Sequence, residues 1–197
     1  MRIYYDCEFS ESGYGRVDLI SIGMKRQDGA EYYAVAADGW SPDTCNDFVR
    51  EHVLPQLGDS PRVTRAQIAA DIIQFVEETR PDLATESARR RRALGGTLPT
   101  TAGVGRTYFA APPEWWGYYV AYDHVLLSQL FGRMIDLPKG WPFFSRDIIQ
   151  LCKHLGNPEL PKQGPGEHNA LADARHNKVM HEYLLAMGGQ PHAQIVS

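Results

Sequence analysis

The 197-residue sequence predicts an α/β domain in which a mixed sheet, three antiparallel strands and then parallel strands, is flanked by helices. Residues 3–37 alternate strand-forming segments with turn residues, which indicates an antiparallel meander. Residues 115–121 form a continuous apolar run, as is typical of a strand buried on both faces. Segments with helical spacing of apolar residues lie between and after these regions, so helices can cover the sheet.

The three opening strands are predicted at 3–9, 17–24 and 31–37. Turn-forming residues separate the first strand from the second. Between the second and the third, Asp28-Gly29 has the composition of a tight hairpin turn. Short turns join antiparallel neighbours, so these strands should lie side by side in chain order.

A first helix is predicted to begin at Ser41, because serine is a favourable N-cap and Pro42 suits the first helical position. Pro55 is expected to end this helix, since proline interrupts helical hydrogen bonding. The residues expected to face inward are Cys45, Phe48, Val49 and Val53.

The other helices are predicted from capping signals and apolar spacing. Thr64 and Gln67 match a capping box ahead of a helix that Pro81 would end. Further helices are predicted at 123 to about 135, with Met134 in the apolar stripe, at about 146 to 155, and at about 169 to 187.

The segment at about 84–112 matches neither pattern and is long for a connection inside a compact domain. We expect an Arg/Gly-rich insertion within a single domain spanning 1–197, because neither flank is a complete domain. The segment contains Arg89, Arg90, Arg91 and Arg92. These arginines either bind substrate phosphates or belong to a solvated surface loop.

Composition limits the classes of function. The net charge is −4, so a nucleic acid would have to be held by a local basic patch or by metal ions. Three cysteines without a CxxC pair make a disulfide framework or a zinc knuckle a poor fit. With no signal-peptide pattern and no apolar run long enough for a bilayer, we expect a cytoplasmic protein without a membrane partner.

Asp6 and Glu8 lie two residues apart on the first predicted strand, so their carboxylates should point to the same side of the sheet. Close like charges raise each other's pKa, and a multivalent cation removes that conflict. The alternative is a pair of solvated acids on an edge strand.

Two later stretches carry further polar groups at helix starts. Asp123 precedes Leu127 by one turn, which places it toward the core, unless it is only the N-cap. His168 follows a Gly-Pro-Gly loop, and Asp173 falls in the first turns of the last helix; the alternative is a surface histidine and an acid that favours the helix dipole. His176, one turn later, either hydrogen-bonds to Asp173 or is an exposed histidine on the helix face.

Taken together, four carboxylates and one histidine are expected to converge, because ligand groups gather where strands end and helices begin. Carboxylate oxygens favour hard cations such as Mg²⁺ or Mn²⁺. Four of them can hold two ions, an arrangement suited to in-line displacement at a phosphodiester. A histidine such as His168 can remove the proton from an attacking water.

The aromatic residues around the predicted buried strand have two interpretations. They could form a stacking platform for nucleobases, but the continuous apolar run favours a role in the core of the sheet. The residues are Trp115, Trp116, Tyr118 and Tyr119.

With D-x-E near the N-terminus, a mid-chain Asp and H-x4-D, the sequence resembles the DEDDh 3′–5′ exonucleases, whose fold is ribonuclease H-like. It is most similar to the small actinobacterial 3′–5′ exoribonucleases of the polyadenylate-specific 3′-exoribonuclease AS type. The shared phrases are YYDCEF, DLISIG, EYYAV, AYDH and HNALADARHN. The resemblance covers about 1–81 and 113–187, and the compact members have no counterpart of 84–112.

The resemblance implies a role for each residue of the pattern. Asp6, Glu8, Asp123 and Asp173 would bind two Mg²⁺ or Mn²⁺ ions, and His168 would be the general base. Beside them, Phe9 would stack on the terminal base. Cys7 replaces the usual Thr, and its side chain should point away from the metals.

By the same resemblance, the expected substrate is the 3′ end of single-stranded RNA, shortened to nucleoside 5′-monophosphates, and a homodimer is plausible. Nothing in the residues excludes a DNA exonuclease of the proofreading or repair type. A non-catalytic nucleic-acid-binding module on the same fold and a small-nucleotide phosphohydrolase also stay open.

Overall fold

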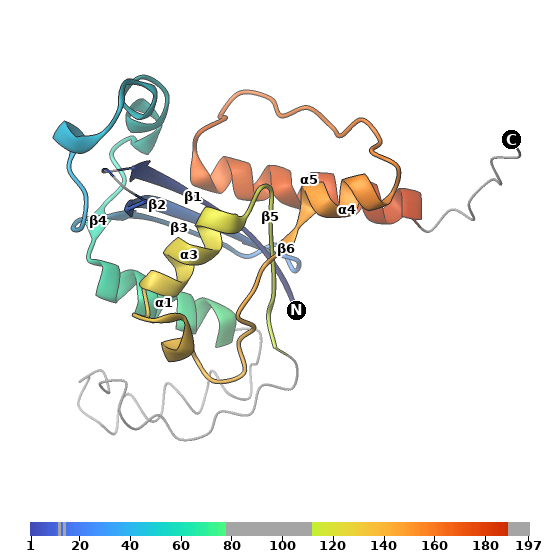
Figure 1. The fold of residues 1–197 in the computed structure, drawn as a ribbon, viewed down its shortest axis with the longest axis horizontal. Coiled ribbons are helices and arrows are strands. Elements are labelled where there is room, and N and C mark those ends of the chain that lie inside the picture. Colours follow the sequence, from blue (N-terminus) through green and yellow to red (C-terminus); the bar gives the residue numbers. More distant parts are fainter. Residues whose placement is uncertain (12, 14, 78–111, 189–197) are drawn as a thin grey trace, which may run out of the picture.

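The computed structural model describes residues 1–11, 13, 15–77 and 112–188. Its six-stranded sheet has the order β4-β3-β2-β1-β5-β6, and helices cover both faces (Figure 1). The predicted α/β class is therefore confirmed, and the mixed sheet is consistent with a ribonuclease H-like fold. Most of the predicted 84–112 insertion, with Arg89, Arg90, Arg91 and Arg92, lies outside the described residues.

The antiparallel half of the sheet follows the prediction. It consists of β1 (Arg2–Glu11), β2 (Val17–Arg26) and β3 (Glu31–Ala36). At the predicted hairpin, Gly29 has a φ of 100°, a conformation that glycine adopts without the penalty of a side chain. The amide of Ala30 donates to the carboxylate of Asp28, which holds the turn closed.

The parallel part is shorter than predicted. It consists of β5 (Glu114–Gly117), β6 (Arg146–Asp147) and β4 (Arg62–Val63). The predicted strand at 115–121 ends early, because the chain turns at Tyr119, whose φ is 53°. Trp115 and Trp116 are buried in the core as predicted, whereas Tyr119 is 62% exposed. Neither two-residue strand was predicted, since two residues carry no periodicity.

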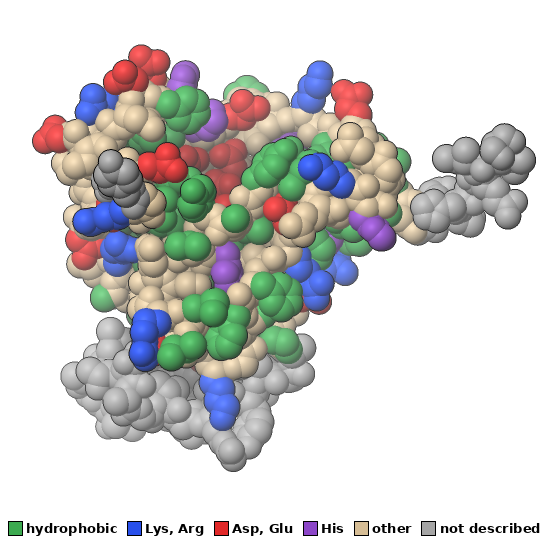
Figure 2. Space-filling model, in the orientation of Figure 1, with side chains coloured by type: hydrophobic (Ala, Val, Ile, Leu, Met, Phe, Trp, Pro, Cys, Tyr) green, Lys and Arg blue, Asp and Glu red, His purple; other side chains and the backbone are tan. Residues whose placement is uncertain are grey.

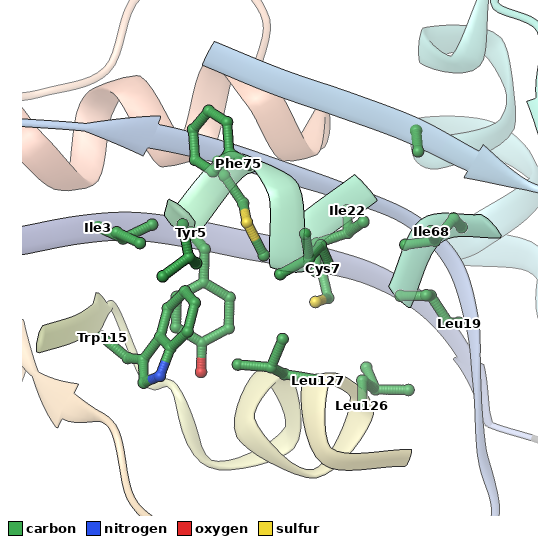
Figure 3. Close-up of a cluster of buried hydrophobic side chains, with 14 of the residues drawn as sticks. Ile3, Tyr5, Cys7, Leu19, Ile22, Ile68, Phe75, Trp115, Leu126 and Leu127 are labelled. Atoms are coloured by element: carbon green, nitrogen blue, oxygen red, sulfur yellow. The ribbon is translucent and has the colours of Figure 1, made fainter. Parts of the chain in front are cut away.

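Within the described residues, four α-helices flank the sheet: α1 (Arg65–Glu77), α3 (Ala121–Gln129), α4 (Ile148–His154) and α5 (Ala170–Gly188). One face is covered by α1 and α3, and the other by α4 and α5 (Figure 1). Figure 3 shows the hydrophobic core on the face that α1 and α3 cover. In this core, β-strand residues pack against Ile68 of α1 and against Leu126 and Leu127 of α3. None of the helices described is both long and apolar enough to cross a membrane.

Two helix predictions need correction. The predicted helix from Ser41 to Pro55 is instead a 3-10 turn η1 (Pro42–Thr44), a π-helical turn η2 (Val49–Val53) and a 3-10 turn η3 (Leu54–Leu57). Val49 and Val53 are buried as predicted, but Phe48, the residue before the π turn, is 52% exposed. Likewise α3 ends at Gln129, and Met134 lies exposed in η4 (Met134–Asp136).

His181 of α5 is a histidine buried on the face that α4 and α5 cover. Its ring stacks on Trp116 at 3.8 Å between centroids, and its Nδ1 lies 2.9 Å from the Tyr4 hydroxyl. Only 1% of the residue is exposed. Burial lowers the pKa of His181 to about 4; the nearby charges belong to Arg2, Glu114, Glu182 and Arg146.

We predict that His181 makes the fold less stable as the pH falls from about 6.5 to about 4. In this window the unfolded chain binds a proton at His181 before the folded chain does, so the free energy of unfolding decreases. Between pH 7 and pH 4.5, His181→Gln should lose about 2 kcal/mol less than the wild-type protein. Denaturant unfolding at several pH values measures this difference.

His154→Gln serves as the control, because His154 is an exposed histidine at the end of α4. Its pH dependence should match that of the wild-type protein. If His181→Gln showed the same pH dependence as well, the buried imidazole would not be the cause.

Candidate active site

Three acidic side chains meet on the face of the sheet that α5 covers. Asp6 and Glu8 of β1 and Asp173 of α5 each offer a carboxylate oxygen, and these oxygens lie within 4.8 Å of one another. In Figure 2 acidic side chains lie recessed near the centre of the face shown, with hydrophobic side chains around them. Three carboxylates at such distances are a ligand set that suits a hard divalent cation.

The alternation along β1 determines which side chains reach this cluster. Cys7, between the two acids, points to the opposite face and packs in the core with Leu126 and Leu127 (Figure 3). The expectation that the Cys7 side chain points away from the acids is therefore confirmed. A residue at this position contributes to the core and not to the acidic cluster.

Asp123 approaches the cluster from the start of α3. β5 pairs with β1 only as far as Tyr4, and beyond that point the Cys7 amide donates to Asp123 Oδ1 at 2.8 Å. Asp123 is buried, and the helix N-cap is Val120, so the alternative of a simple capping role does not hold. The carboxylate instead lies against the backbone of the strand that carries Asp6 and Glu8.

A hydroxyl bridge helps to fix the start of α3 against β1. Ser145 Oγ lies 2.6 Å from the Tyr5 hydroxyl and 2.9 Å from His124 Nδ1. Tyr5 and His124 each neighbour one of the acids in the sequence. The bridge therefore links the two segments on which Asp6 and Asp123 lie.

Gly23 of β2 lets α5 approach the sheet closely. It pairs directly with Asp6, and a Cβ atom on Gly23 would lie 2.2 Å from the Leu171 amide nitrogen and 2.3 Å from the Ala170 carbonyl. The first turn of α5 thus packs directly on the β2 backbone. Any side chain at position 23 would occupy the space that this turn fills. This contact brings Asp173 within reach of Asp6.

Two polar interactions hold α5 in that position. Asn177 Nδ2 donates to the carbonyl of Tyr5 at 3.0 Å, inside the protein. At the surface, the guanidinium of Arg175 donates to both carboxylate oxygens of Glu31 on β3, at 2.9 and 2.7 Å. A bidentate pair of this kind fixes orientation as well as distance.

Burial and mutual repulsion raise the pKa values of the clustered acids. Burial is the main cause for Glu8, whose pKa rises to about 8, with Asp173 and Asp123 adding to the effect. The pKa of Asp6 is raised well above its usual value, by burial and then by Asp123 and Glu8. The pKa of Asp123 rises to about 7, mainly through burial. A bound cation would offset these costs.

His168 lies next to Asp173 in the loop before α5. Its amide donates to Asp173 Oδ2 at 3.0 Å, and Gln163 Nε2 donates to the other carboxylate oxygen. His168 has a φ of 68°, an uncommon conformation for a residue with a side chain. The predicted contact from His176 to Asp173 is wrong, because His176 Nε2 lies 3.0 Å from the carbonyl of Pro161.

Aromatic side chains lie on the elements around the acids. Phe9 packs against Tyr122 with 5.5 Å between ring centroids. Phe48 and His52 lie beside the ring of His168, at 5.0 and 5.9 Å. A hollow of about 380 Å³ extends along η2, η3 and the loop before α5; it is lined by Glu51, His52, Gln56 and residues 163–168.

Sequence reasoning missed several residues of this arrangement. Gln163 and His52 carry no motif, and Phe48 was predicted to be buried because it is apolar. Gly23 lies in a strand, where an isolated glycine can indicate close backbone approach. Gly23 carries that signal in the sequence, between Ile22 and Met24.

Comparison with known proteins gives the family. Residues 1–185 match the model of the 3′-5′ exoribonuclease Rv2179c-like domain, and the chain belongs to this family. It is similar to 3′-5′ exoribonuclease Rv2179c of Mycobacterium tuberculosis strain ATCC 25618 / H37Rv and to 3′-5′ exoribonuclease MT2234.1 of strain CDC 1551 / Oshkosh. Identity to each is 36% over 178 residues, 89% of this chain and 88% of the relative.

We predict that Gly23→Ala lowers the stability of the fold, because the new Cβ would overlap the backbone of Ala170 and Leu171. Overpacking of this kind costs about 1–3 kcal/mol. Gly188→Ala at the far end of α5 is the matched control, since its Cβ would make an ordinary contact with Leu155. Thermal unfolding of both variants tests the prediction; a Gly23→Ala protein as stable as the control would show that α5 can move aside freely.

Proposed function

We propose that this protein is a metal-dependent 3′–5′ exoribonuclease of the DEDDh type that removes nucleoside 5′-monophosphates from single-stranded RNA 3′ ends. The observation that supports this most is the meeting of Asp6, Glu8 and Asp173, with Asp123 held against the same strand. The names of the relatives, both 3′-5′ exoribonucleases, support RNA as the substrate.

The carboxylates would hold two Mg²⁺ or Mn²⁺ ions, since they offer only oxygen donors. When bound, such ions supply an activated water and stabilise the leaving 3′ oxygen. His168 would accept the proton of the attacking water at an imidazole nitrogen. The hydrogen bond from the backbone amide of His168 to the Asp173 carboxylate keeps the histidine beside the acids. Phe9, packed on Tyr122, would offer a ring face to the terminal base.

Several proposals rest on the sequence alone. They are the binding of substrate phosphates by Arg89, Arg90, Arg91 and Arg92, the homodimer and the cytoplasmic location. DNA as a substrate stays the alternative, because discrimination depends on contacts to the 2′-hydroxyl.

A gel assay tests the proposed function directly. Single-stranded RNA and the matching DNA, each labelled at the 5′ end, are incubated with the protein and Mg²⁺ or Mn²⁺, with a chelator as control. We expect a metal-dependent ladder that shortens from the 3′ end, faster on RNA than on DNA. No ladder on either strand, with the fold intact, would instead favour the non-catalytic module or a small-nucleotide substrate.

We predict that Asp6→Asn loses both turnover and the stabilisation by metal. Turnover should fall about a thousandfold, because a bound metal supplies several kcal/mol of transition-state stabilisation. In the presence of a chelator the variant should be at least as stable as the wild-type protein, since one of the crowded carboxylates is gone. Mg²⁺ or Mn²⁺ should raise the Tm of the wild-type protein but not that of the variant.

Asp59→Asn is the control for this experiment, because Asp59 is an exposed acid distant in sequence from the motif residues. It should keep both the activity and the metal-dependent rise in Tm. An Asp6→Asn protein that is fully active would refute the assignment of Asp6 as a metal ligand.

A further inference from the structure

A π-helical turn lies beside the candidate active site. η2 spans Val49–Val53, and Phe48 is its N-terminal flanking residue. π turns are rare and occur frequently at functional sites. Here the turn places the rings of Phe48 and His52 together, with 4.8 Å between their centroids. Val49 and Val53 of the same turn are buried, so the turn is anchored in the core while these two rings stay outside it.

Both rings contact the imidazole of His168. Phe48 meets it edge to face, at 5.0 Å and an interplanar angle of 83°, and His52 lies at 5.9 Å. Among the residues that the structure describes, no hydrogen bond holds the His168 side chain; its amide alone is bonded, to Asp173. The orientation of the imidazole therefore depends on ring packing.

We propose that Phe48, supported by His52, is a positioning residue that holds the imidazole of His168 toward the acidic cluster. This inference rests on the proposed function, in which His168 accepts a proton. The left-handed backbone at His168 fixes where the side chain starts, and the ring of Phe48 limits where it can turn.

The exposure of Phe48 separates this role from a role in the core. The residue is 52% exposed, so its side chain adds little to the stability of the fold. His52 and His168 also line the same hollow as Gln163, the side chain that donates to Asp173. The rings of His52 and His168 thus border the space next to a proposed metal ligand, and Phe48 packs against both rings.

Phe48→Ala tests the inference, with Phe143→Ala as the matched control. Phe143 is also 52% exposed and lies in a different loop. In Phe48→Ala, kcat should fall about tenfold to a hundredfold, as for a misplaced catalytic group, while KM and Tm stay near the wild-type values. Phe48→Tyr keeps the ring and should restore most of the kcat, and Phe143→Ala should behave as the wild-type protein.

A second measurement does not depend on turnover. The Cε1 proton of His168, assigned by its absence in His168→Ala, should shift in the NMR spectrum of Phe48→Ala, because the neighbouring ring current is lost. The same signal should be unchanged in Phe143→Ala. An unchanged His168 signal in Phe48→Ala would overturn the proposed contact, whatever the activity.

A double-mutant cycle separates positioning from direct contact with the substrate. In a His168→Ala background, adding Phe48→Ala should cost no further activity, since there is no imidazole to position. A raised KM that persists in that background would overturn the inference and assign Phe48 to the binding of a nucleobase. An unaltered kcat in the single variant would overturn it too, whereas an inactive wild-type protein would instead refute the proposed function.

Discussion

The burial of like charges beside one another is the constraint on which the site depends. Burial is the main reason that the pKa values of Asp6 and Glu8 are raised, and repulsion from the neighbouring acids Asp123 and Asp173 adds to it. Such a cluster opposes its own assembly unless a cation joins it or rigid elements hold it. In this fold the acids lie on a strand of the sheet and at the starts of two helices, where backbone hydrogen bonds limit their movement.

Of these elements, α5 has the most restricted position, because it packs on the sheet with no side chain in between. This helix carries Asp173. Gly23 makes that contact, and Asn177 and Arg175 tie the helix to β1 and β3. The interactions are of different kinds, steric, buried polar and surface ionic. They restrain both the distance of the helix from the sheet and its orientation, which a single contact would not do.

Local pattern was enough to predict the three antiparallel strands, β5 and most helices, but not the two-residue strands β4 and β6. It also singled out Asp6, Glu8 and Asp173, which the structure brings together. Alternation places Asp6 and Glu8 on one side, and helix spacing places Asp123 inward. The helix predicted from Ser41 to Pro55 was wrong because a capping serine, an N-terminal proline and apolar spacing do not distinguish an α-helix from successive 3-10 and π turns. Gly23 and Gln163 act on residues far from them in sequence, so no local pattern identifies their contacts.

Several irregular points of the backbone lie close to the acids in sequence or in space. The register of β1 against β2 shifts between Glu8 and Phe9, His168 has a positive φ, and the π turn adjoins His168. Bulges and strained residues persist only where the surrounding structure holds them, and they often accompany active sites. Regular elements set the distances among the carboxylates, whereas these departures from regularity direct Phe9, Phe48 and His168. Fixed distances among the carboxylates require rigid elements. The side chains of Phe9, Phe48 and His168 require orientations that an ideal strand or helix does not provide.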